Sequence, residues 1–181
     1  DDLRNIYLSF DENDAKKVKE IENKTNHDVK AVEYFIKEKF DQLKLKEFKE
    51  FIHFGLTSQD INNTAVPYSI KEATKKVLLP KLKEVLVIMK KKADQWKETP
   101  LLARTHGQAA SPTRMGKEIK VFIERIEKQL ELLETIPFTA KFGGATGNFN
   151  AHHIAFPEIK WEKFSDKFIE EKLDLIRQQT T

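Results

Sequence analysis

Along most of the chain, apolar residues recur at steps of three and four, which is the spacing of one face of an α-helix. From Asp11 to about Lys44 this pattern predicts one or two helices, with a break near Asn23–Asn26 and a cap at Asp11 or Asn13. A short apolar run follows and leads to Gly55, where we expect a helix end and a turn.

The longest predicted helix covers about Gln59–Glu98, and its apolar stripe requires long neighbouring helices to cover it. Pro80 lies inside this helix and is expected to kink it, because proline lacks a backbone N–H donor and crowds the preceding turn. Thr99-Pro100 is expected to end the helix.

A second long helix is predicted to open at Pro112 and to end before Pro137, after a segment, Leu101–Ser111, that we interpret as a polar loop. The two long helices would then be antiparallel, as in a helical bundle. Lys141–His153 is rich in glycine and asparagine and is predicted to be irregular, whereas Pro157–Leu175 is predicted to be helical. The expected fold class is all-α.

Composition narrows the class of protein further. The 181 residues contain six glycines, six prolines and no cysteine, which favours a helical domain and excludes a disulfide-stabilised miniprotein. Neither a run of about 18 apolar residues nor a secretory leader is evident, so we expect a cytoplasmic protein that does not act at a membrane. Basic residues exceed acidic ones by only 32 to 29 and are spread along the chain, which argues against nucleic acid as a partner.

Two polar segments near the N-terminus could bind anions. In Thr25–Asp28, His27 beside Asp28 could titrate near neutrality or donate to a phosphate; the alternative is an exposed helix start with Asn26 as its cap. Thr57 and Ser58 precede a predicted helix, where hydroxyl groups and free backbone amides suit a carboxylate or phosphate; the alternative is capping alone. His53, just before them, is more simply a packed, hydrogen-bonded side chain between Phe51 and Phe54.

A third polar segment, Arg104–Gln108, gathers a guanidinium, a hydroxyl, an imidazole and an amide around a glycine. The imidazole of His106 suits a general acid at neutral pH; the alternative is a solvated loop histidine. Gly143–Asn148 superficially suggests a phosphate-binding loop, but the Gly-Lys-Ser/Thr ending is missing and a flexible turn is favoured. The spacings typical of metal ligands are also missing, so we expect neither a metal ion nor a cofactor.

Four segments, taken in order, resemble the adenylosuccinate lyases: Asn26–Val29, His53–Asn63, Arg104–Gln108 and Gly143–His152. The Thr-Ser and Thr-His segments resemble the whole fumarase/aspartase superfamily. The Asn-His-Asp-Val and Asn-x-Asn-Ala-His runs are narrower and resemble the bacterial-type adenylosuccinate lyases. The resemblance covers the chain from about Asp11 onward.

This resemblance implies the long antiparallel helices of a fumarase/aspartase-type central bundle, present here as a partial domain. Residues 1–56 would be an N-terminal helical segment and residues 57–181 part of the bundle, without an independent second domain. It also implies a homotetramer whose active sites lie where subunits meet. The implied reaction is β-elimination of fumarate from adenylosuccinate, giving AMP, and from the succinyl-carboxamide ribonucleotide of purine biosynthesis.

The resemblance also assigns roles to individual residues. His106 would be the general acid, and Thr105 would help to orient the substrate beside it. Thr57 and Ser58 would hold carboxylate or phosphate groups of the substrate. The nucleotide site would be lined by three consecutive residues, Asn26, His27 and Asp28.

The chain also departs from the family pattern. The general base of the family is a serine in a segment like Gly-Ser-Ser-x-Met-Pro-x-Lys-x-Asn-Pro, which these 181 residues lack, and family members are more than twice as long. We therefore expect a fragment that is inactive by itself. Alternatives are a non-catalytic helical module that keeps the bundle as an oligomerisation surface, another lyase of the fumarase superfamily and, least favoured, a nucleic-acid binder.

Overall fold

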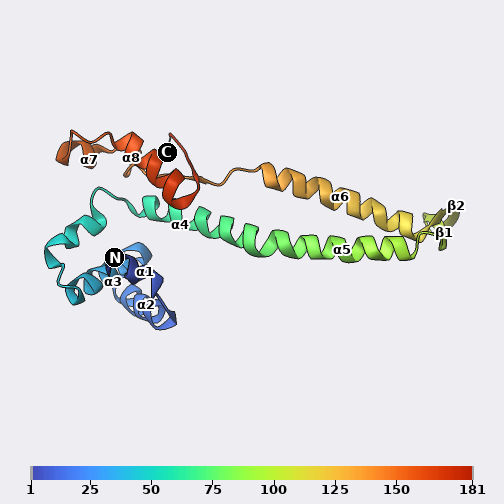
Figure 1. The fold of residues 1–181 in the computed structure, drawn as a ribbon, viewed down its shortest axis with the longest axis horizontal. Coiled ribbons are helices and arrows are strands. Elements are labelled where there is room, and N and C mark those ends of the chain that lie inside the picture. The colour runs from blue at the N-terminus through green and yellow to red at the C-terminus, as the bar shows by residue number, and fades with distance from the viewer. Residues whose placement is uncertain (1, 181) are drawn as a thin grey trace. The chain divides into compact units, whose positions relative to one another are not determined.

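A computed structural model describes residues 2–180 of the chain (Figure 1). The chain divides into two compact units, one formed by Asp1–Pro67 with Thr139–Thr181 and the other by Tyr68–Phe138. Helices dominate both units, which confirms the all-α prediction. Among the described residues, no helix combines the length and the apolar character that crossing a membrane requires.

The first unit begins with three α-helices and a 3₁₀ helix: α1 (Asp2–Leu8), α2 (Glu12–Thr25), α3 (Asp28–Gln42) and η1 (Lys46–His53). Asp11 caps α2, because its carboxylate accepts the backbone N–H groups of Asn13 and Asp14 at 2.8 and 2.9 Å. The predicted break lies at Asn26, whose left-handed backbone ends α2. After η1, Gly55 takes a positive φ of 64°, which confirms the predicted turn.

The long helix predicted from Gln59 to Glu98 consists of three segments: α4 (Ser58–Ala73), a single π-helical stretch η2 (Thr74–Leu78) and α5 (Leu79–Gln95). The π stretch ends at Leu78, two residues before Pro80. Because proline cannot donate a backbone hydrogen bond and its ring crowds the preceding turn, a wider turn relieves the crowding there. The helix ends at Gln95, earlier than the sequence predicts.

In the second unit, α5 packs against α6 (Met115–Thr135), and the two lie side by side in Figure 1. Their shared core consists of Leu86, Ala93, Ile123 and Leu130. The ion pairs Lys83–Glu134 and Lys90–Glu127 show that the helices are antiparallel, as predicted.

The connection between these helices is a β-hairpin, so the prediction of a loop is wrong. Strand β1 (Pro100–Thr105) pairs with the antiparallel strand β2 (Gln108–Arg114). Pro112 was predicted to open the second helix but lies in β2, and α6 begins three residues later. The strands expose most of both faces, so they lack the alternation of apolar and polar residues by which a half-buried strand is predicted.

The chain then completes the first unit. Strands β3 (Thr139–Ala140) and β4 (Ile176–Arg177) form a short parallel pair, and between them lie α7 (Asn150–Ala155), α8 (Trp161–Lys167) and the π-helical η3 (Phe168–Lys172). The segment predicted to be irregular thus ends in a short helix, and the predicted helix at 157–175 is shorter than expected. Aromatic rings pack around the buried His152 here: Phe54, Phe142, Phe149 and Trp161.

Candidate functional site

The connection between α2 and α3 places the first predicted polar segment at a helix start. His27 is the N-cap of α3, and its Nδ1 accepts the backbone N–H of Lys30 at 3.3 Å. Asn26 ends α2 instead of capping α3, which corrects the simpler interpretation of this segment. The Asp28 carboxylate accepts the N–H of Val29 at 2.8 Å and lies 3.4 Å from His27 Nδ1.

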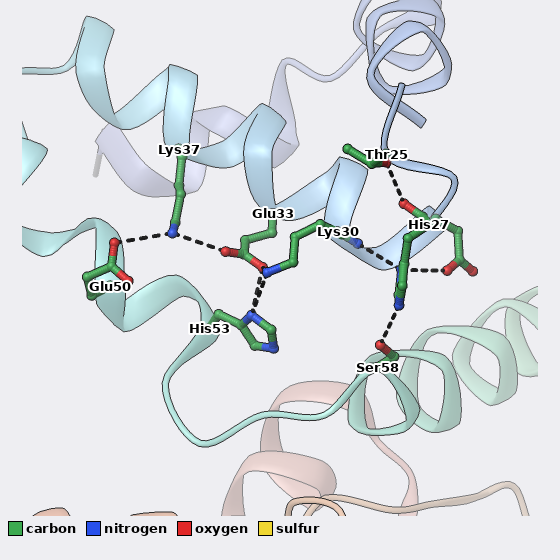
Figure 2. A network of polar contacts seen from close by, with 9 residues as sticks. Thr25, His27, Lys30, Glu33, Lys37, Glu50, His53 and Ser58 are labelled. Carbon is green, nitrogen blue, oxygen red and sulfur yellow. Dashed lines mark hydrogen bonds and ion pairs between the residues drawn. The ribbon is translucent and has the colours of Figure 1, made fainter. Parts of the chain in front are cut away.

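His27 also reaches the second predicted segment. Because Nδ1 is an acceptor, the neutral ring carries its proton on Nε2, which donates to Ser58 Oγ at 3.3 Å (Figure 2). Ser58 is the first residue of α4 and lies 31 residues further along the chain. The structure therefore brings together two segments that the sequence analysis singled out independently.

A buried carboxylate holds a second histidine next to this contact. Glu33 of α3, with a side chain only 8% exposed, binds Lys30 Nζ at 2.6 Å, Lys37 Nζ at 3.0 Å and His53 Nδ1 at 2.7 Å (Figure 2). Burial raises the pKa of Glu33, but the hydrogen bonds from Lys30 and Lys37 and the positive charge of Lys30 outweigh it, so the net pKa lies below its usual value. Glu33 is therefore ionised at neutral pH.

His53 is the residue that sequence reasoning missed. It was interpreted as a packed, hydrogen-bonded side chain, and the hydrogen bond is present, but 39% of the side chain is exposed. Its Nδ1 faces Glu33 and lies 3.3 Å from Lys30 Nζ, so its Nε2 is on the side of the ring turned away from both. The sequence signals only the ion pairs of Glu33, because Lys30 and Lys37 stand three residues before and four after it and so share its helix face. The contact with His53 is made by the tertiary fold.

Thr57 and Ser58 open α4 beside a cavity. The Asp60 carboxylate accepts the backbone N–H of Thr57 at 2.9 Å, and the Asp60 N–H donates back to the Thr57 carbonyl at 3.0 Å, a reciprocal arrangement typical of helix starts. The cavity has a volume of about 360 Å³. It is lined by Gly55, Leu56, Thr57, residues 143–146, Asn150 and Ala151. The glycine-rich segment thus lines the same cavity as Thr57.

The third predicted segment belongs to the second unit. Thr105 ends β1 and pairs with Gln108, while His106 and Gly107 form the turn, with φ of 50° and 76°. Positive φ at both central residues is the type I′ pattern of two-residue hairpin turns. Both side chains, Thr105 and His106, are exposed. Their predicted catalytic and orienting roles stay predictions.

Comparison with known proteins identifies relatives of the chain. A family model described as "Lyase" matches residues 1–180. Adenylosuccinate lyase of Dictyostelium discoideum is 60% identical over 171 residues, which are 92% of this chain and 37% of that protein. Adenylosuccinate lyase of Vibrio cholerae is 48% identical over 169 residues, 93% of this chain and 37% of that protein. The resemblance to adenylosuccinate lyases is confirmed, and the chain spans about 37% of the length of these curated relatives.

Solved structures share the fold at low sequence identity. Fumarate lyase from Mesorhizobium sp. BNC1 has a TM-score of 0.79 at 18% identity, over 99% of this chain and 40% of that one. The 3-carboxy-cis,cis-muconate lactonizing enzyme from Pseudomonas putida has a TM-score of 0.75 at 19% identity, over 94% of this chain and 37% of that one. These likenesses confirm the predicted fold class.

Proposed function

Because the chain belongs to the lyase family, we propose that it supplies part of the active site of an adenylosuccinate lyase. The enzyme would eliminate fumarate from adenylosuccinate, giving AMP, and from the succinyl-carboxamide ribonucleotide of purine biosynthesis. The observation that carries the proposal is the contact between His27 and Ser58, which joins two of the segments that resemble the adenylosuccinate lyases.

The reaction needs one base and one acid. A base removes a proton from the succinyl carbon next to the carboxylate, and the resulting aci-carboxylate carbanion expels the purine nitrogen as the C–N bond breaks. The electron pair of the carbanion becomes the double bond of fumarate, and the acid protonates the departing nitrogen. His106 is the proposed acid, with Thr105 orienting the substrate beside it.

Binding would use the polar groups of the first unit. Thr57 and Ser58 hydroxyls would donate to a carboxylate or phosphate, and Asn26, His27 and Asp28 would line the nucleotide site. To this set we add His53, on the support of its contact with Glu33: with Nδ1 directed at that carboxylate, the protonated ring would donate from Nε2 to an anionic group. The resemblance further supports a cytoplasmic homotetramer.

A second candidate function is a non-catalytic helical module that serves for oligomerisation. Exposed apolar side chains on α5 and α6 favour it, among them Val87 (66% exposed), Ile88 (61%) and Phe122 (58%). The two candidates differ in one measurement, because only the enzyme releases fumarate.

The deciding experiment measures fumarate release from adenylosuccinate by the full-length protein that contains this chain. We expect release by the wild type, and a fall in kcat of about 10²- to 10⁴-fold in His106→Gln, because a positioned acid contributes on this order. The 181-residue chain alone is expected to be inactive, since it contains the proposed acid but no segment like that of the family's base serine.

The control is His153→Gln, which changes a histidine of α7 outside the proposed site and should leave kcat unaltered. Circular dichroism would establish that both variants fold. Unchanged turnover in His106→Gln would remove this residue as the acid. Release of fumarate from a different substrate only would support another lyase of the superfamily.

A further inference from the structure

Asp60 in the first turn of α4 is one of the largest fully buried side chains, with 2% of its surface exposed. A carboxylate in this setting is stable only when its oxygens are paired. Oδ2 accepts the N–H of Thr57 at 2.9 Å, and Oδ1 accepts the Lys141 ammonium at 2.8 Å and the Gly143 N–H at 2.9 Å. The Gly144 N–H reaches both oxygens, at 3.2 and 3.0 Å.

These donors lie far apart in the sequence. Lys141, Gly143 and Gly144 lie 81 to 84 residues beyond Asp60. Lys141, itself 4% exposed, also donates from its ammonium to the Gly144 carbonyl and from its backbone N–H to the Asn63 carbonyl, the latter at 3.2 Å. One carboxylate therefore connects two of the segments that line the cavity of about 360 Å³, residues 55–57 and 143–146.

The glycines give this loop the shape that the carboxylate needs. A Cβ at Gly143 would lie 2.8 Å from the Gly147 carbonyl oxygen, and Gly144 has a φ of 78°. A Cβ at Gly144 would lie 3.4 Å from the carbonyl oxygen of Gly55, which also lines the cavity. The tight winding directs two consecutive N–H groups at one acceptor, as in other backbone anion sites.

Stability alone gives little reason for such an arrangement. A buried ion pair is often no better for stability than a well-packed apolar pair of the same volume. What charged hydrogen bonds add is direction, because each N–H must point at an oxygen lone pair. Here the bond to the Thr57 N–H fixes the backbone position of Thr57, and therefore that of Ser58, the next residue, at the start of α4.

We propose that Asp60, with Lys141, is a positioning residue of the substrate site. It fixes the Thr57–Ser58 turn against the Gly143–Gly144 wall, so that the two hydroxyl groups meet the anionic groups of the substrate in one arrangement. The identity of that substrate rests on the proposed function above. The connection between the two walls of the cavity, the Thr57–Ser58 turn and Gly143–Gly144, does not.

The first test measures hydrogen exchange by mass spectrometry on the full-length protein. In Asp60→Asn, peptides covering residues 55–60 and 141–147 should exchange at least tenfold faster than in the wild type. Asp14→Asn is the matched control, because it removes the same charge from another ion pair of the first unit, in which Asp14 binds Lys39 at 2.9 Å. It should leave those two peptides unchanged.

The second test measures fumarate release by the same variants. Asp60→Asn should raise KM for adenylosuccinate at least tenfold and lower kcat less than threefold, since binding geometry is lost while the proposed acid and base remain. Asp14→Asn should alter neither constant. A purely structural role would instead lower the activity of both variants in proportion to their loss of folded protein.

Each outcome decides the proposal. Unchanged exchange and KM in a folded Asp60→Asn would overturn it. If that variant does not fold, Lys141→Met, which keeps the bonds from Thr57, Gly143 and Gly144, should raise KM at least threefold, and an unchanged KM would overturn the proposal. If the wild type releases no fumarate, the proposed function fails, and the exchange experiment alone decides whether Asp60 holds the walls together.

Discussion

His152 is the clearest case of a single residue whose surroundings set its chemistry. Its side chain is 1% exposed, its ring lies 4.7 Å from that of Trp161, and within residues 2–180 its Nδ1 has no hydrogen-bond partner. Burial away from water lowers the pKa of His152, because the charged form loses its hydration. A Cβ at Gly55 would lie 2.5 Å from this ring, so the imidazole fills the space directly under the turn that leads to Thr57.

The burial of His152 predicts that the free energy of unfolding decreases as the pH falls. In the unfolded chain the histidine takes up a proton near pH 6.5, whereas the folded protein resists protonation until a lower pH. Between these two values the unfolded state binds more protons, so the contribution is fully present above about pH 6.5 and is lost progressively below it. We expect the free energy of unfolding in urea to decrease between pH 7.5 and 5.5.

Two variants test whether the pH dependence comes from His152. His152→Leu should flatten the pH dependence over that window, because the titrating group is gone. His153→Leu, which changes the neighbouring and partly exposed histidine, should keep it. An identical pH dependence in the wild type and His152→Leu would contradict the assignment.

At the scale of elements, the packing of α5 on α6 depends on Gly116. A Cβ there would lie 2.2 Å from the Ala93 carbonyl oxygen and 2.8 Å from Lys97 Cα, both backbone atoms that cannot move aside independently. The backbone N–H of Gly116 also donates to the Trp96 carbonyl at 3.0 Å. The start of α6 is thus in direct backbone contact with the end of α5.

Gly116→Ala should therefore destabilise the second unit by about 3 kcal/mol, the upper part of the range for overpacking a close contact. Denaturant unfolding gives the difference. Gly107→Ala is the matched control, because a Cβ there meets no described atom within 4 Å and only its left-handed backbone is strained, at a cost of about 1 kcal/mol. A loss in Gly116→Ala no greater than in the control would contradict the prediction.

Elements that bury one face were predictable from the sequence, and the others were not. The helices on either side of Asn26 and the helix α6 carry apolar stripes, so their periodicity shows them. The β1–β2 hairpin buries almost nothing, so its only local signal was the turn at His106-Gly107. A start at Pro112 was a reasonable prediction, since the fixed φ of proline fits both a first helical turn and an extended strand.

The same reasoning applies to the site. His27, Thr57 and Ser58 were found because local patterns mark helix starts, and the contact between His27 and Ser58 supports that choice. The role of Asp60 was invisible, because an acid in the first turn of a helix looks like an ordinary favourable charge. Its partners at residues 141–144 are brought to it only by the tertiary fold.

At the scale of the whole molecule, the exposed apolar surface predicts association. Val87 and Ile88 on α5 are 66% and 61% exposed, and Leu132 on α6 is 59% exposed. Soluble monomers rarely leave large contiguous apolar patches in water. We expect the chain to form a homo-oligomer, which a mass measurement in solution would detect.

Substitution separates this association from a general charge effect. The double variant Val87→Glu, Ile88→Glu should shift the mass towards that of the monomer, because charged groups would be desolvated at the contact. Lys91→Gln, on the same helix, makes the net charge more negative without altering apolar surface and should leave the mass unchanged. A wild-type chain that is a uniform monomer would contradict the prediction.

The tip of the β1–β2 hairpin determines how the molecule presents one ionisable ring to its surroundings. Because paired strands fix the backbone on either side, the imidazole of His106 keeps little freedom beyond its own two rotatable bonds. A group held in this way gives up less conformational entropy on meeting a ligand than the same group on a floppy segment. Asparagine or glycine is the usual occupant of such a left-handed position, so the histidine holds its ring in place at a cost in backbone energy that those residues avoid.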